Sequence, residues 1–83
     1  PNPFNPLTTI SYDLPQDSYV KITIYDPLGN VVNNLVNANQ LSGKRSIQWN
    51  ATNSIGHTVA AGIYIYRIES GGTRQTKKMV LLK

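Results

Sequence analysis

Apolar and polar residues alternate along most of this 83-residue chain, and the alternation limits it to β-structure. Residues 10–14 read Ile-Ser-Tyr-Asp-Leu, and residues 20–24 read Val-Lys-Ile-Thr-Ile. Successive side chains of a strand point to opposite faces, so each run predicts a strand with one buried face. The helical period is not sustained in any stretch of the sequence. We therefore expect an all-β fold.

Turn-forming residues separate the predicted strands. Residues 26–29 (Asp-Pro-Leu-Gly) predict a type I turn followed by a glycine bulge, and the Gly-Gly pair within 70–73 predicts a two-residue hairpin loop. Residues 37–44 are expected to form a polar loop between strands at 31–36 and 45–49. Short strands with turns at this spacing are typical of an immunoglobulin-like, two-sheet antiparallel β-sandwich of about seven strands.

The chain opens on Pro-Asn-Pro-Phe-Asn-Pro, which can join neither a helix nor a central strand. Proline fixes φ and donates no backbone hydrogen bond, so this segment is a stiff, extended lead-in. We expect a proline-rich lead-in over residues 1–7 and a single sandwich domain over 8–83. Phe4 is predicted to anchor the lead-in by packing against the sandwich. An ordinary interdomain linker is the alternative.

The formal charge of +4 invites a nucleic-acid interpretation, but the basic residues are not arranged as one binding patch. Half of them fall within residues 74–83, where they predict an edge strand protected by lysines. We therefore expect no nucleic-acid partner. The chain has no cysteine, and no stretch reads as a membrane span or a signal peptide, so any export signal lies elsewhere or is the domain itself.

Residues for catalysis are scarce. His57 is the only histidine and falls in a predicted loop, and the four acidic residues lie in separate predicted elements. We expect no enzyme activity, no cofactor and no small-molecule substrate. Tyr64 and Tyr66 alternate on one predicted strand, where core packing is favoured over a platform for stacking sugars or bases.

The loop after Trp49 is rich in side-chain oxygens. Asn50, Thr52, Asn53 and Ser54 are neutral, whereas calcium prefers carboxylates, so side-chain-capped turns are favoured over a metal site. Trp49 itself is the largest core candidate, and its indole N–H needs an acceptor if it is buried.

The ordered set of turn and core residues resembles the type A C-terminal sorting domains of type IX secretion cargo, and it is similar to the immunoglobulin-like domain of the flagellar hook-cap scaffold. The resemblance covers essentially the entire chain. Its motifs are PNPFNP, the segments 9–15 and 20–35, Gly43 before Trp49, the segment 56–68, and the tail 77–83. The family usually reads Trp-Asp-Gly where this chain has Trp49-Asn50-Ala51, which lowers the chance of an ion in that loop.

The resemblance implies a non-catalytic secretion signal in Bacteroidetes-like bacteria. Such a domain passes through the periplasm with an N-terminal cargo domain and is recognised by the type IX outer-membrane translocon. A sortase-like peptidase then attaches the cargo to the cell surface or releases it. The resemblance assigns partner recognition to Lys77, Lys78, Met79, Val80, Leu81, Leu82 and Lys83.

A second function stays open at this point. The same fold suits a permanent module, either an assembly scaffold of the hook-cap kind or a carbohydrate-contacting accessory domain of a secreted enzyme. Burial of both Tyr64 and Tyr66 would remove the main support for the carbohydrate interpretation.

Overall fold

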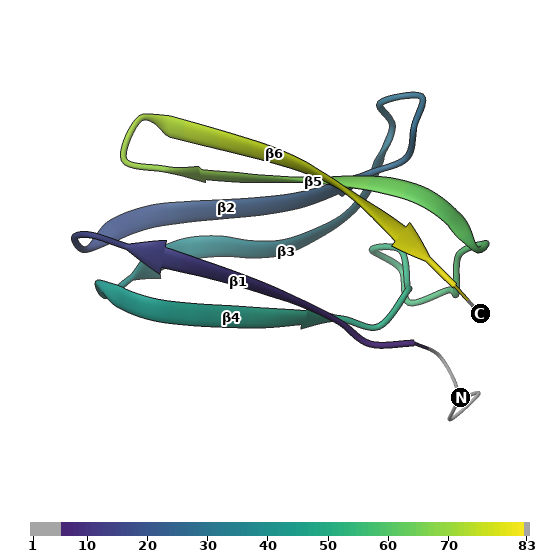
Figure 1. The fold of residues 1–83 in the computed structure, drawn as a ribbon, viewed down its shortest axis with the longest axis horizontal. Helices are drawn as coiled ribbons and strands as arrows, with labels where there is room; N and C mark the ends of the chain where they lie inside the picture. Colours follow the sequence, from purple (N-terminus) through teal and green to yellow (C-terminus); the bar gives the residue numbers. More distant parts are fainter. Residues whose placement is uncertain (1–5, 83) are drawn as a thin grey trace.

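The computed structural model describes residues 6–82, which form six strands and include no helix that could span a membrane (Figure 1). The strands are β1 (Thr8–Leu14), β2 (Ser18–Tyr25), β3 (Val31–Gln40), β4 (Gly43–Trp49), β5 (Gly62–Ser70) and β6 (Thr73–Leu81). They make a two-stranded sheet, β1-β4, and a four-stranded sheet, β3-β2-β5-β6, with antiparallel pairing throughout. The all-β, two-sheet prediction is confirmed, with six strands in the described residues against about seven expected.

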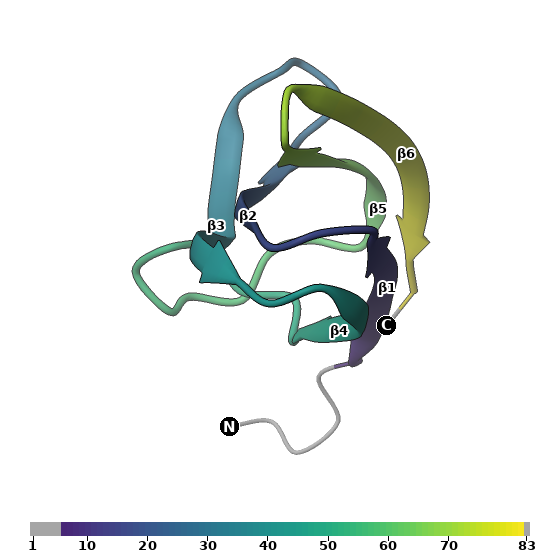
Figure 2. The ribbon, with the colours of Figure 1, turned by 90° about the vertical axis from the view of Figure 1, so that its left-hand side faces the viewer.

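The two sheets form separate layers with the core between them. In both ribbon views β1 and β4 lie below the larger sheet, and Figure 2 shows this end-on. The inward residues of the alternating runs fill the interlayer space: Ile10, Tyr12, Leu14, Val20, Ile22, Ile24, Trp49, Tyr64, Ile68 and Leu81 are all buried.

Trp49 is the largest buried side chain of this core and has the acceptor that its indole needs. It is 1% exposed, and its Nε1 donates to the carbonyl of Thr52 over 2.7 Å. Its ring meets that of Tyr64 edge-on, with centroids 5.3 Å apart. An indole N–H without an acceptor would be costly here, so the loop that supplies Thr52 stabilises the core directly.

The two predicted turns have the expected chemistry. The Gly29 amide donates to the carbonyl of Asp26 over 3.0 Å, and Gly29 has φ 90°, as a type I turn with a glycine bulge requires. Gly71 and Gly72 both have positive φ and join Ser70 to its cross-strand partner Thr73. Two positive φ angles identify a type I′ turn, whose twist suits a tight hairpin.

The predicted polar loop at 37–44 is wrong. β3 continues to Gln40 and β4 begins at Gly43, because the backbone of residues 37–40 pairs with that of residues 18–21. β3 is an edge strand, and exposed polar side chains there need no apolar alternation. Only Leu41 and Ser42 connect the two sheets at this point.

Candidate recognition surface on strand β6

β6 carries most of the tail assigned to partner recognition, and it is the last strand of the four-stranded sheet. Among residues 6–82 it pairs with β5 alone, which leaves its other edge open in this part of the chain. Residues 77–81 belong to the strand, Leu82 follows directly, and Lys83 lies outside the described residues. Residues 77–81 of the tail therefore belong to a regular edge strand packed on the domain.

The fold divides the tail into two sets of side chains. Leu81 is 2% exposed and belongs to the core, and Met79 packs against that core from the same face. Lys77 alternates with them but remains exposed. Leu81 is therefore inaccessible to a partner, and Met79 offers one only the part of its side chain that the core leaves exposed.

The opposite set points to the outer face of the larger sheet. Lys78 and Val80 alternate with the inward residues, and Val80 is 62% exposed. Leu82, beyond the end of the strand, is 75% exposed. The side chains of the tail that do not pack in the core are therefore both basic and apolar.

The backbone of β6 alternates in the same way. In an antiparallel pair of strands, directly opposite residues alternate between two states: they either form two backbone hydrogen bonds with each other, or direct their N–H and C=O groups away from each other. The two residues that flank a two-residue turn form a hydrogen-bonded pair. Counting from Ser70 and Thr73, the outward-facing residues also direct their N–H and C=O groups to the open edge. These residues are Arg74, Thr76, Lys78 and Val80.

Arg74 and Thr76 were not among the predicted site residues. Both are exposed, and both present backbone groups at the open edge. The sequence held the signal, because a Gly-Gly hairpin fixes which residues of the following strand face outward. That signal becomes usable once the turn type is known.

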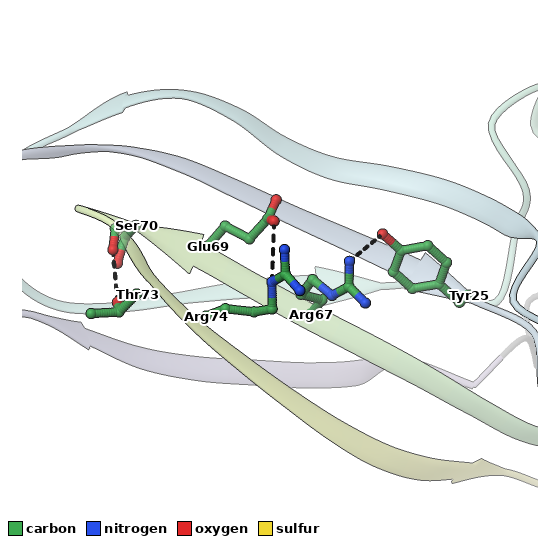
Figure 3. Close-up of polar contacts among 6 residues, drawn as sticks. All are labelled: Tyr25, Arg67, Glu69, Ser70, Thr73 and Arg74. Carbon is green, nitrogen blue, oxygen red and sulfur yellow. Dashed lines mark hydrogen bonds and ion pairs between the residues drawn. The ribbon is translucent and has the colours of Figure 1, made fainter.

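The basic residues of β6 are mostly unpaired. Arg74 Nε lies 3.7 Å from a carboxylate oxygen of Glu69, a contact drawn in Figure 3. Lys77 and Lys78 take part in no ion pair among residues 6–82. The prediction of an edge strand carrying lysines is confirmed, and such charges oppose uncontrolled pairing with other chains.

The other candidate sites have structural roles. Asn53 Oδ1 accepts from the amides of Ile55 and His57, at 3.2 and 2.9 Å, while Asn50 Oδ1 accepts from the Thr52 hydroxyl at 2.6 Å. His57 is exposed, and the described residues contain no cluster of three or more His, Asp or Glu side chains arranged to hold a metal. The loop is built from side-chain-capped turns.

The two tyrosines of β5 pack inward. Tyr64 is 8% exposed and its hydroxyl donates to the carbonyl of Ala60 over 2.7 Å. Burial, followed by the charge of Asp26, raises the pKa of this phenol. Tyr66 is half-buried against the core. Core packing is confirmed for Tyr64 and holds in part for Tyr66, so the pair is a poor stacking platform.

The model of a known family matches residues 1–82, nearly the whole chain, and its description is a secretion system C-terminal sorting domain. The chain belongs to this family. It is a type IX sorting domain, as its turn and core residues predict, and such domains direct export toward the cell surface or beyond. A search of curated proteins finds no match.

The sorting domain is also similar to a solved structure, that of FlgD from P. aeruginosa. The two share 26% sequence identity with a TM-score of 0.73, over 93% of this chain and 61% of the FlgD chain. The sorting domain therefore spans less than two thirds of that chain. The likeness bears out the expected relation to an immunoglobulin-like hook-cap domain at the level of fold.

Proposed function

We propose that this domain is a non-catalytic export signal that is read in its folded state. An N-terminal cargo domain brings it into the periplasm, the type IX outer-membrane translocon binds it, and the cargo moves to the cell surface or the medium. A sortase-like peptidase then removes the domain. Membership of the sorting-domain family supports this role.

The observation that carries the proposal is that the outward-facing side chains of β6 are not used in the core. Lys78 and Val80 face solvent on an open edge, while Met79 and Leu81 hold the same strand on the core. An edge of this kind accepts an added strand, whose backbone supplies affinity while side-chain contacts supply specificity. Lys77 and Lys78, with Lys83 beyond the described residues, suit an acidic receptor surface.

The lead-in would present the junction with the cargo. A stiff proline-rich segment keeps the boundary from pairing with either neighbour, which favours access by a peptidase. Phe4 is proposed to anchor the lead-in on the sandwich, and it lies outside the described residues.

The proposal is tested by export of a fluorescent reporter. The reporter carries a periplasmic signal peptide at its N-terminus and residues 1–83 at its C-terminus, in a type IX-competent host and in the same host without the translocon. We expect secretion in the first host only. Periplasmic retention of the intact, folded fusion in both hosts would reject the proposal.

Deleting residues 77–83 is a poor control for that experiment. The deletion removes Leu81 from the core, so lost secretion would report misfolding as readily as lost recognition. Substitutions confined to outward-facing residues avoid this ambiguity.

A permanent assembly module is a second candidate, favoured by the likeness to FlgD across nearly the whole chain. This function predicts that the domain stays attached to its neighbours and does not carry a reporter across the outer membrane. The same export experiment separates the two.

A further inference from the structure

Arg67 lies on the outer face of β5, and only part of its guanidinium forms hydrogen bonds with residues 6–82. Its guanidinium carbon is 5.1 Å from the centre of the Tyr25 ring, and its Nη1 donates to the Tyr25 hydroxyl over a long 3.4 Å (Figure 3). Its Nε is buried without a hydrogen-bond partner. A guanidinium has five donors in a planar fork, and because Nε is buried, a partner from outside reaches Arg67 through its Nη groups.

No carboxylate neutralises this charge within residues 6–82. Glu69 is two residues away on the same strand face, but its carboxylate faces Arg74 at 3.7 Å. Loss of water from a charged group is costly unless another group compensates, so the buried Nε is the part of Arg67 that lacks compensation. Stacking on Tyr25 offsets part of that cost.

The residues around Arg67 combine apolar surface with positive charge. The register places Ile65 between Tyr25 and Lys78, and places Ile63 beside Val80. Cross-strand partners share a face of the sheet, so these side chains form one surface. Ile63 is 46% exposed and Val80 62% exposed, whereas Ile65 is half-buried.

We propose that this outer face is the docking surface for an acidic, partly apolar protein partner, and that Arg67 receives one of its carboxylates. The docking surface consists of Tyr25, Ile63, Ile65, Arg67, Lys78 and Val80. A carboxylate matches the planar donors of arginine in a two-bond contact, and Lys78 adds a second positive charge. Apolar partner side chains would cover Ile63 and Val80.

Charge and polarity together select this occupant. A second copy of the chain would bring Arg67 and Lys78 against the same cations, which disfavours self-association. A phosphate backbone would meet the cations but leave Ile63 and Val80 without apolar contact. A protein surface supplies both kinds of contact. The assignment of this partner to the export machinery rests on the proposed function. The preference of the surface for an acidic, partly apolar protein does not depend on that function.

The test is NMR of the 83-residue chain during titration with a capped peptide of alternating valine and glutamate. We expect saturable shifts of the Arg67 Nε–H and of the Ile63 and Val80 amides. Arg67→Met keeps a long unbranched side chain on this face and removes the charge, so it should weaken binding about tenfold or more without unfolding the domain. Arg67→Lys should retain part of the affinity.

Arg45→Met is the matched control, since Arg45 is a half-buried arginine of the other sheet. It should bind the peptide as the unaltered chain does. Absence of saturable shifts, or equal binding by Arg67→Met, would overturn the proposal. So would stronger perturbation of Arg67 by duplex DNA, by phosphatidylglycerol vesicles or by self-association. Peptide binding without reporter export would reject the proposed function and leave this inference standing.

Discussion

Strands β2 and β6 belong to one sheet but are constrained in opposite ways. β2 is a central strand, and its residues Val20, Ile22, Thr23 and Ile24 are all buried, so both of its faces are covered at that point. β6 is an edge strand in which residues 73–78 are all exposed and only Leu81 is buried. Packing therefore constrains half of the eight residues of β2 but only one buried residue of the nine in β6.

The difference separates residues needed for folding from residues available to a partner. The inward residues of β6 hold the strand in place, and the outward ones contribute little to the core. Their basic and apolar character fits protection of the edge and recognition by a partner. Stability and export should accordingly respond to different substitutions in the same domain.

Ile22→Ala should have the largest effect. Ile22 is a core residue that is 0% exposed, so the substitution should lower the free energy of unfolding by about 2–5 kcal/mol. Val80→Ala on the outer face should change it by less than about 0.5 kcal/mol. Urea unfolding followed by tryptophan fluorescence measures both. If both substitutions lowered the free energy of unfolding equally, β2 and β6 would not differ in how strongly packing constrains them.

Leu81→Ala sharpens the contrast within β6 itself. Leu81 is 2% exposed although it lies near the end of an edge strand, so we expect a loss of about 2–3 kcal/mol. The same unfolding assay measures it. A cost as small as that of Val80→Ala would show that the terminal strand is not anchored through the core.

Proline substitutions separate the two edges of β6. Gln75→Pro removes an N–H bonded to Ile68 and should cost about 1–3 kcal/mol, because the partner carbonyl is left unsatisfied. Thr76→Pro removes an N–H at the open edge and should cost less than about 1 kcal/mol. Thermal unfolding compares the pair. A reversed order would mean that the assigned backbone alternation is wrong.

The smallest effect concerns the turn that ends β2. Hydrogen bonds from Asn30, with those from the Leu28 and Gly29 amides, hold the pKa of Asp26 below its usual 3.8. A lowered pKa contributes stability above pH 3.8 that is lost as the pH falls through 3.8 toward the folded-state value.

Asp26→Asn keeps an acceptor for the turn but has no charge to titrate, so part of the acid-induced loss of stability should disappear. The melting temperature measured from about pH 6 down to about pH 2 checks this expectation. Asp13→Asn, at an exposed position of β1, is the matched control. If the melting temperature of Asp26→Asn fell at low pH as much as that of the unaltered domain, the Asp26 carboxylate would not contribute to the loss of stability in acid.

The sequence was informative where apolar alternation and turn chemistry agree. The inward residues of β1 and β2, the Asp26 turn, the Gly-Gly hairpin and the need of Trp49 for an acceptor were all predictable, because each follows from one local rule. The extension of β3 to Gln40 was not. Polar residues on an exposed edge carry no alternation to reveal a strand.

The sequence predicted which segment carries the recognition residues but not which of its side chains face solvent. The tail 77–83 was assigned as one unit, whereas pairing with β5 turns Met79 and Leu81 inward and Lys78 and Val80 outward. The stacking of Arg67 on Tyr25 joins residues 42 positions apart. No local pattern encodes such a contact, because it depends on the register of β2 and β5.

Export of the folded reporter by two matched double variants tests the central claim most directly. Lys78→Glu with Val80→Ser alters the outward half of β6, and Lys44→Glu with Leu41→Ser makes a comparable pair of changes, charge reversal and loss of an apolar side chain, at exposed positions near the start of β4. We predict that the first loses secretion about tenfold or more while its melting temperature is preserved, and that the second is secreted like the unaltered domain. Equal secretion of the two variants would contradict recognition through the solvent-facing half of β6.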